Sequence, residues 1–278
     1  MKKRRINRAI AYLALIALGL MGIAPILYLL ILSSKRRIDI LLQVPPNLNF
    51  DWNRISANYS EVLFNQGILD FILNSVIVVG SSTLIALVIG TPAAYAFSRM
   101  PFRGNQTLAS AILSMRFMPP IAVAIPLFLM IKAVGVQDSY PGLILPYVAF
   151  SLPVVVWISI GFFDEVPQEI DDAAMMDGCT RFGVLWRVML PIVRPGLVTA
   201  ALFAAIFTWS EFLVALYVID SRSFQTITLG AATLISAQRP IDWNIAATVG
   251  VVTVVPILIF SLFVQRYIVR GLTTGAIK

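Results

Sequence analysis

The sequence has 278 residues, of which 59% are hydrophobic and only 13% are charged, against about 25% charged in an ordinary soluble domain. A single cysteine and the absence of histidine exclude an intramolecular disulfide, a cysteine cluster for metal and any histidine-based metal or catalytic site. The net charge of +7 comes without a basic patch interleaved with aromatic residues, so it indicates membrane topology and not nucleic-acid binding.

The N-terminus is a basic run, MKKRRINR, followed by an uncharged apolar run over residues 9–32. A secretory signal peptide has the same order of charges. Its apolar region, however, is only about 7–15 residues long and ends at a small-residue cleavage site of the A-x-A type. Here the run is too long and no such site follows it. The sequence therefore predicts a first span that is retained.

Six stretches are long enough to cross roughly 30 Å of hydrocarbon as helices. Two contain a charged residue, Arg116 in the third and Glu211 in the fifth. Repeated ten-residue segments of alternating hydrophobicity, the signature of a transmembrane barrel, are not present. We therefore expect an all-α, multi-pass membrane protein that forms one permease domain over residues 1–278. The expected spans are residues 9–32, 71–97, 107–131, 143–163, 196–219 and 245–264.

Orientation follows from the Lys and Arg residues on each side of these spans, because cytoplasmic loops carry the excess. With the N-terminus inside, the cytoplasmic side holds Lys2, Lys3, Arg4, Arg5, Arg8, Arg99, Arg103, Arg181, Arg187, Arg194, Arg266, Arg270 and Lys278, thirteen in all. The outer side holds Lys35, Arg36, Arg37, Arg54, Lys132, Arg222 and Arg239, seven in all. The sequence thus predicts that both termini are cytoplasmic. The basic triplet at 35–37, just after the first span, would by itself favour the opposite orientation.

The cytoplasmic loop over residues 164–195 contains EIDDAAMMDGCTRFGVLWRVMLP. Pro167 suits the first position of a helix, and the acidic residues that follow lie where the helix dipole favours negative charge. Gly178 is expected to end this helix. Thr180 can cap a second one, in which Phe182, Leu185 and Met189 form an apolar stripe.

Pro191 and Pro195 are expected to end the second helix before the fifth span. The loop is thus a helix–glycine–helix elbow with apolar and acidic residues together. A membrane-surface helix would be basic. Two interpretations remain: the elbow docks as a short amphipathic helix in the groove of a protein partner, or it packs only on its own bundle.

The same loop resembles the cytoplasmic loop of the inner-membrane subunits of binding-protein-dependent ABC importers, whose pattern is EAA-x3-G-x9-I-x-LP. Here it is Asp172-Ala173-Ala174, then Gly178, Val188 and Leu190-Pro191, with every spacing kept. Asp172 replaces the usual Glu and Val188 the usual Ile, so the carboxylate and the branched apolar side chain are retained.

Further segments resemble the carbohydrate-uptake branch of that family, in particular the smaller permease of the maltose-type importers. They are MPPIAVAIPLFLMIKAVGVQDSYPGLILPY from Met118, TWSEFLVAL from Thr208 and the tail VRGLTTGAIK. Ser210 stands where the family usually has Asn. The resemblance covers roughly residues 71–278. The N-terminal quarter is similar only in the arrangement of its segments.

The resemblance implies a type I ABC importer permease of the bacterial inner membrane that transports a sugar, a polyol or a glycerol-derived solute. It implies four partners besides the bilayer: two ATP-binding subunits, a second homologous permease and an extracytoplasmic solute-binding protein. ATP would be bound and hydrolysed by the ATP-binding subunits, and the permease would be no enzyme and hold no cofactor. The chain contains no G-x-x-x-x-G-K-[ST] loop, in keeping with that division.

The resemblance also assigns residues that would contact the ATP-binding subunits. Those of the elbow are Glu169, Asp172, Ala173, Ala174, Gly178, Leu190 and Pro191. Those of the cytoplasmic tail are Gly271, Leu272, Thr273, Thr274 and Gly275.

Four polar or aromatic residues in the spans are candidates for a solute path. Glu211 is expected at the translocation path or in a polar contact with a partner subunit, or it is simply hydrated near the outer end of its helix. Trp209 stacks on a sugar, or it belongs to the interfacial aromatic belt. Arg116, just before a double proline that should interrupt its helix, pairs with Glu211, lines a cavity, or snorkels. Asn74 is the weakest of the four.

Two other classes of protein compete with an ABC permease. A secondary transporter or channel would use an ion gradient, but the spans contain Glu211 as their one acid, and no matched pair of broken helices is evident in two halves of the sequence. A membrane enzyme would need an acid–base pair or a metal cluster, and the sequence suggests neither.

Overall fold

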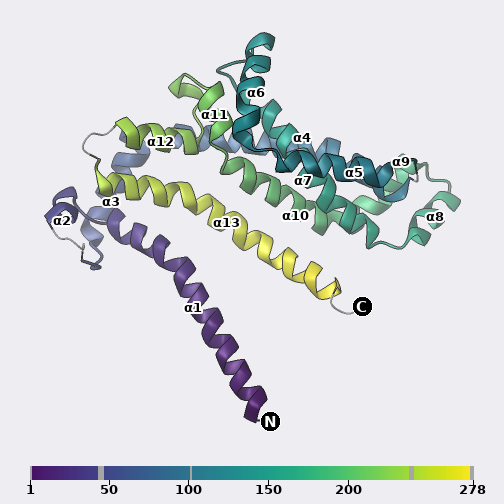
Figure 1. Cartoon of the computed structure of the whole chain (residues 1–278), viewed down its shortest axis with the longest axis horizontal. Coiled ribbons are helices and arrows are strands. Elements are labelled where there is room, and N and C mark those ends of the chain that lie inside the picture. Colours follow the sequence, from purple (N-terminus) through teal and green to yellow (C-terminus); the bar gives the residue numbers. More distant parts are fainter. Residues whose placement is uncertain (1, 43–46, 101, 238–240, 276–278) are drawn as a thin grey trace. The chain divides into compact units, whose positions relative to one another are not determined.

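The structure is a computed structural model that describes residues 2–42, 47–100, 102–237 and 241–275. Over these ranges the chain is helical, with α-helices joined by short π- and 3-10 segments and no strand (Figure 1). The elements are α1 (Lys2–Ser33), α2 (Arg37–Leu42), α3 (Trp52–Ser60), η1 (Glu61–Asn65), α4 (Ile68–Arg99), α5 (Asn105–Ser114), η2 (Met115–Phe117), α6 (Pro120–Val134), α7 (Tyr140–Asp164), α8 (Gln168–Met176), α9 (Arg181–Val184), η3 (Leu185–Met189), α10 (Leu190–Trp209), α11 (Leu213–Val218), η4 (Arg222–Phe224), α12 (Ile227–Ala237) and α13 (Trp243–Gly275).

Five helical segments among the described residues are long and apolar enough to cross a membrane, and a sixth crosses if a bent pair is one span. The five are Ile10–Ser33, Ile68–Arg99, Tyr140–Asp164, Arg181–Trp209 and Trp243–Phe263. The all-α, multi-span prediction is therefore confirmed. Helices suit this environment because each one satisfies its own backbone hydrogen bonds in lipid.

The bent pair is the third predicted span, residues 107–131. It consists of Asn105–Phe117 and Pro120–Val134, which meet at 95°. Met118 is extended, and Pro120 opens α6 at a position where a missing amide hydrogen is harmless. The expected interruption at the double proline is confirmed, and it is a sharp corner within the stretch predicted as the third span.

The fifth predicted span needs two corrections. Its C-terminal part is broken, because α10 ends at Trp209 and α11 begins at Leu213. Its inner boundary is also wrong, because Pro191 and Pro195 do not end the preceding helix. One helical segment runs through both prolines, and the π-helical η3 changes the hydrogen-bond register just before Pro191. In addition, the outer loop predicted over 220–244 contains the apolar helix α12.

The chain groups into two compact units. Unit 1 consists of residues 1–69 and 231–255, and unit 2 of residues 70–230 and 256–278. Both α12 and α13 pass from one unit to the other.

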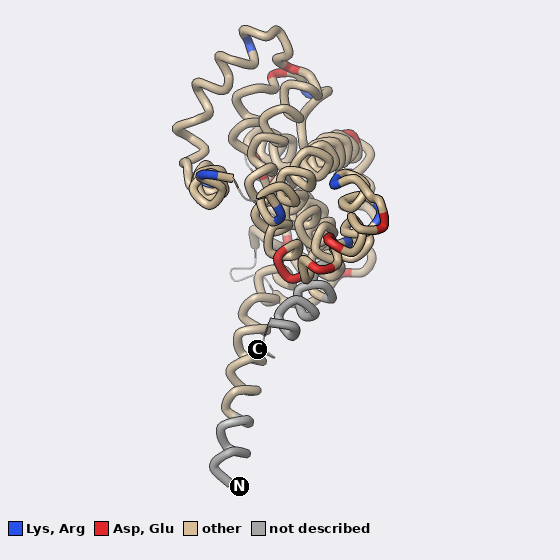
Figure 2. The backbone as a smooth tube through the Cα atoms, turned by 90° about the vertical axis from the view of Figure 1, so that its right-hand side faces the viewer, with Lys and Arg blue, Asp and Glu red and all other residues tan. Residues whose placement is uncertain are grey.

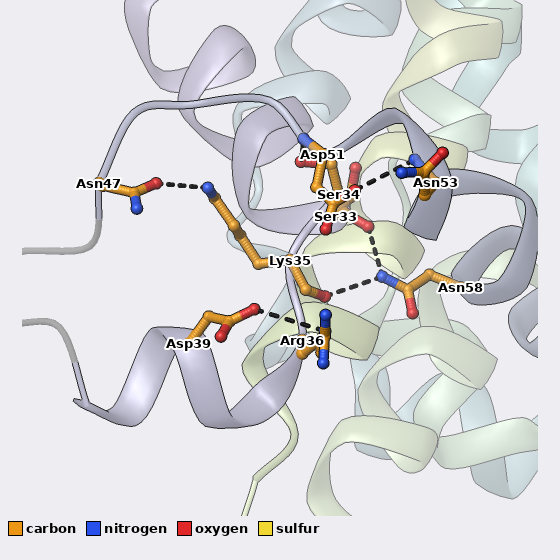
Figure 3. A network of polar contacts seen from close by, with 9 residues as sticks. All are labelled: Ser33, Ser34, Lys35, Arg36, Asp39, Asn47, Asp51, Asn53 and Asn58. Carbon is orange, nitrogen blue, oxygen red and sulfur yellow. Dashed lines mark hydrogen bonds and ion pairs between the residues drawn. The ribbon is translucent and has the colours of Figure 1, made fainter.

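Unit 1 is held by a polar network at the C-terminal end of α1 (Figure 3). Asn58 donates from its amide to the carbonyl oxygens of Ser33 (2.7 Å) and Lys35 (3.0 Å), which have no helical partner beyond the end of α1. The Asp51 backbone amide donates to the Ser34 hydroxyl at 3.1 Å. The loop and α3 therefore fix the last turn of the first span.

The same network engages each charge of the basic triplet at 35–37. Lys35 is buried and donates to the Asn47 side chain. Arg36 lies 3.8 Å from the Asp39 carboxylate, and Arg37 lies 2.7 Å from that of Asp242 at the start of α13.

Unit 2 is built on the packing of α10 along α7. The contact is close because Gly196 leaves room for the Phe162 ring: a Cβ at residue 196 would lie 2.1 Å from the ring. Two apolar clusters sit at opposite ends of this pair. One joins α8, α9 and η3 to α4 and α7, and the other joins α11 and α6 to α7 and α4.

Candidate functional site

The elbow between α8 and α9 forms as predicted. α8 ends at Asp177, and Gly178 takes the left-handed conformation with φ +85°. The Gly178 amide donates to the Met175 carbonyl and the Cys179 amide to the Ala174 carbonyl, both at 3.0 Å, which closes the helix end in a Schellman motif. The Thr180 hydroxyl then accepts from the Gly183 amide at 3.1 Å and caps α9. Pro167 lies at the N-cap position of α8, one residue before its predicted place, and makes no side-chain capping hydrogen bond.

A mixed acidic and apolar surface results, which we call the elbow surface. It consists of the exposed residues Glu169, Asp172, Ala173, Met176, Phe182 and Trp186. Met176 is 88% exposed, and the rings of Phe182 and Trp186 lie 5.9 Å apart. Figure 2 looks onto the end of unit 2 that carries α8, where acidic segments gather.

Two of the residues assigned to this surface lie elsewhere. Ala174 is buried in the cluster that joins α8 to α4 and α7, and Leu190 packs partly against the same cluster. The predicted stripe also divides: Leu185 and Met189 are buried, whereas Phe182 is exposed. Phe182 lies in the first turn of α9, whereas Leu185 and Met189 lie in η3 and pack in the cluster with α4 and α7. Gly178 and Pro191 are exposed, and their assignment to an ATPase contact stays a prediction.

Sequence reasoning missed Asp171, which is buried although its neighbour Asp172 is exposed. Tyr95 donates to one of its carboxylate oxygens at 2.8 Å, and the Arg99 Nε donates to the other at 3.0 Å. Both partners come from α4. Two adjacent acids on an amphipathic helix point about 100° apart, and this difference is the signal that could have separated them.

The two broken spans bring their breaks together in unit 2 around a cavity of about 290 Å³. The cavity is mainly apolar, with a few polar side chains. Its lining is Met115, Arg116, Met118, Pro120, Val123, Tyr147, Ala149, Phe150, Ser151, Pro153, Phe207, Thr208 and Glu211. In secondary transporters, discontinuous helices commonly form the solute site, and the two breaks here offer a comparable arrangement.

Glu211 occupies the break between α10 and α11. Its carboxylate accepts from the Tyr147 hydroxyl at 2.8 Å and from the Val214 amide at 3.0 Å, so it caps α11 as well as facing the cavity. Arg116 lies with its guanidinium 4.4 Å from the centre of the Phe207 ring. Among the described residues no ion pair joins Arg116 to Glu211, so of the alternatives for Arg116 the structure favours the lining of a cavity.

Trp209 and Asn74 do not line this cavity. Trp209 is buried, and its ring meets Phe260 of α13 edge-on at 6.0 Å. Asn74 donates to the Ser223 carbonyl (2.9 Å) and accepts from the Tyr140 hydroxyl (2.7 Å), so it ties the segment after α11 to α4 and α7. Both side chains make contacts within the fold, and their assignment to a solute path stays a prediction.

The tail residues 271–275 continue α13, which extends to Gly275. The side chains of the tail lie outside the part of the chain that the structure describes. Their assignment to an ATPase contact stays a prediction.

A bundle of apolar helices with a cavity between two broken spans, and an exposed amphipathic elbow at one end, defines a membrane transport subunit. Residues 86–274 match the family described as the binding-protein-dependent transport system inner membrane component. The chain belongs to this family. It is the multi-pass, inner-membrane permease of a binding-protein-dependent ABC importer, works in a complex with a binding protein and ATPases, and is not itself an enzyme.

Curated relatives match over nearly the whole chain. The trehalose transport system permease protein SugB of Mycobacterium tuberculosis is 35% identical over 92% of this chain and 93% of its own length. The sulfoquinovosyl glycerol transport system permease protein SmoH of Agrobacterium fabrum is 32% identical over 98% of this chain and 94% of its own. A bacterial ABC transporter involved in the import of the acidic polysaccharide alginate shares the fold, with a TM-score of 0.79 at 20% identity over 96% of this chain and 98% of the other.

Proposed function

We propose that this permease imports a carbohydrate-type solute, such as a sugar, a polyol or a glycerol-derived solute. The relatives named for trehalose and for sulfoquinovosyl glycerol support this class. The solute would pass the cavity of unit 2, where Arg116, Tyr147 and Glu211 offer polar groups among apolar walls. Such a mixture suits a sugar ring, which has apolar faces and a polar rim.

The elbow surface is the contact for the ATP-binding subunits, of which we propose two for each complex. The single observation that carries this proposal is the combination of a rigid, capped helix end with large exposed apolar side chains. Met176, Phe182 and Trp186 are exposed beside the acids Glu169 and Asp172. Short amphipathic helices with this composition bind in the grooves of partner proteins. A surface that only packed on its own bundle would not leave these side chains exposed.

A second, homologous permease completes the membrane part of the proposed complex. The first span, Ile10–Ser33, supports this: only 6% of its most apolar stretch is buried within the chain, against 56% for Tyr140–Asp164. A helix so little covered contacts lipid or another subunit along most of its surface. We also propose that both termini lie in the cytoplasm. The basic triplet Lys35, Arg36 and Arg37 is the one group of charges that argues against this orientation. Its side chains bind nearby polar or acidic partners, which weakens that argument.

The test is co-expression of the chain with its ATP-binding subunits, second permease and binding protein, followed by pull-down and uptake. We expect Trp186→Ser with Met176→Asp to release the ATP-binding subunits while membrane insertion is unchanged. Trp52→Ser is the matched control, because Trp52 is also an exposed tryptophan but lies in unit 1. Uptake of labelled trehalose, maltose, polyols and glycerophosphodiesters then tests the solute class. Full retention of the ATP-binding subunits by the double variant would contradict the proposed contact.

A further inference from the structure

The buried acid of α8 joins the elbow to a membrane span. Asp171 and Arg99 form an ion pair with an Nε to Oδ2 distance of 3.0 Å, and their side chains are only 7% and 8% exposed. Tyr95, one turn earlier on α4, donates to the other carboxylate oxygen at 2.8 Å. A terminal nitrogen of Arg99 also donates to the Val166 carbonyl, just before α8, at 2.6 Å. Four contacting groups thus fix α8 to the end of α4.

This arrangement resists movement of α8 relative to α4. The attraction between two charges is stronger away from water than at the surface, and a buried charge left without its partner is strongly unfavourable. Turning or tilting α8 would separate Asp171 from Arg99 before any other contact could replace it. The apolar contact of Ala174 with the cluster around Tyr95 and Phe163 acts in the same direction.

α4 then connects this contact to the solute cavity. In its N-terminal half, Val78 belongs to the apolar cluster that contains Tyr147, Val214 and Ala215. Tyr147 lines the cavity and donates to Glu211. From Arg99 to Val78 the helix covers roughly 30 Å at about 1.5 Å per residue. Gly90 keeps α4 close to α7 between the two ends, since a Cβ there would lie 2.8 Å from Val155.

We propose that Tyr95, Arg99 and Asp171 are positioning residues that transmit movement of α8 to α4, and through α4 to the wall of the solute cavity. The inference rests on the proposed docking of the ATP-binding subunits on the elbow surface. It assigns the two neighbouring acids different tasks: Asp172 faces the partner, and Asp171 holds the elbow to the span.

The experiment follows the cavity wall in the assembled complex, independently of which solute is carried. Cys179→Ser removes the one cysteine of the chain, and Met118→Cys places a new one at the cavity lining. The labelling rate with N-ethylmaleimide is measured with and without ATP plus vanadate, which traps the closed ATPase dimer. We expect trapping to change the rate about fivefold or more in this background, the low end of coupling between linked sites.

Arg99→Gln, Asp171→Asn and Tyr95→Phe should reduce or abolish this change, with the ATP-binding subunits still bound and still trapped by vanadate. Arg99→Lys keeps the charge and should restore part of the change. Arg103→Gln, an exposed arginine just beyond α4, is the matched control and should leave it intact.

The outcomes separate this inference from the proposed docking. If the variant Trp186→Ser with Met176→Asp still binds the ATP-binding subunits in full, the docking proposal is wrong. If these subunits bind the Cys179→Ser background and are trapped, and Arg99→Gln and Tyr95→Phe respond to trapping like Arg103→Gln, the transmission proposal is wrong. Should a single charge variant fail to fold, Tyr95→Phe and the double variant Arg99→Gln/Asp171→Asn decide the matter. The double variant leaves no buried charge unpaired, and a normal response in both variants overturns the proposal.

Discussion

The hydroxyl of Tyr147 donates a 2.8 Å hydrogen bond to the carboxylate of Glu211 at the point where the fifth span is broken. This contact joins α7 to the start of α11 and faces the cavity of unit 2. The same carboxylate caps α11, so one side chain supports the break and contributes to the cavity lining.

Glu211→Ala should destabilise the protein more than Glu211→Gln. Alanine leaves the Tyr147 hydroxyl and the Val214 amide without their acceptor, at about 1–3 kcal/mol for each buried group left unpaired. Glutamine keeps an acceptor oxygen for both. The measurement is the thermal midpoint of the detergent-solubilised complex by fluorescence-detected size exclusion. Glu165→Gln, an exposed acid beyond α7, is the control. Equal midpoints for the alanine and glutamine variants would contradict the capping role.

Gly178→Val should leave membrane insertion intact but separate ATP hydrolysis from uptake or release the ATP-binding subunits. No atom lies within 4 Å of a Cβ built at this glycine, so the cost is backbone strain at φ +85°, about 1–2 kcal/mol. Relief of that strain re-aims α8. Gly161→Ala is the matched control, because Gly161 lies in α7 with equally open space. Uptake and ATPase pull-down are measured in the same membranes. Normal values of both for Gly178→Val would contradict the coupling role of the elbow.

Asp172→Ala should have a similar but milder effect, since it removes an exposed charge and leaves the backbone unchanged. An exposed ion pair contributes only about 0–1 kcal/mol, so we expect partial retention of the ATP-binding subunits that declines at high salt. Retention that is independent of salt would exclude a charged contact at Asp172.

Gly196→Ala should destabilise the α7–α10 contact by about 1–3 kcal/mol, the usual cost of overpacking. The added Cβ would lie 2.1 Å from the Phe162 ring. Phe162→Leu should recover part of the loss in the double variant, and the thermal midpoint measures both effects. If Phe162→Leu adds its own loss to that of Gly196→Ala, the two residues are not in the proposed contact.

The orientation of the chain is tested by impermeant thiol labelling in the Cys179→Ser background. A cysteine at Ser236, which is exposed near the end of α12, should react from outside intact cells. A cysteine at the C-terminus should react only after the membrane is permeabilised. The reverse pattern would overturn the predicted topology.

Deleting residues 273–278 should weaken ATPase assembly or its stimulation by the binding protein. The tail resembles that of the family, and it follows α13 on the side predicted to be cytoplasmic. The measurement is ATPase pull-down together with stimulated hydrolysis. Unchanged values for both would show that the tail makes no functional contact.

Local signals were enough to predict the elbow. Glycine takes a left-handed backbone without the Cβ penalty that other residues meet, so Gly178 predicts a helix end wherever it lies in space. The hydroxyl of Thr180 reaches an amide three residues ahead, so its cap is also local. The helix ends predicted at Pro191 and Pro195 were wrong. A π-helical segment just before Pro191 changes the hydrogen-bond register there, and the helix continues where the prolines were expected to end it.

By itself, the sequence determined the class of protein, the helical spans and the loop that carries the family pattern, because apolar length and residue spacing are properties of the chain alone. The tertiary structure decided the tasks of single polar residues. It placed Asp171 inside and Asp172 outside, turned Glu211 toward Tyr147, and buried Trp209 against Phe260. A buried polar group must find its partner on another helix, and which helix lies opposite is settled only when the bundle packs.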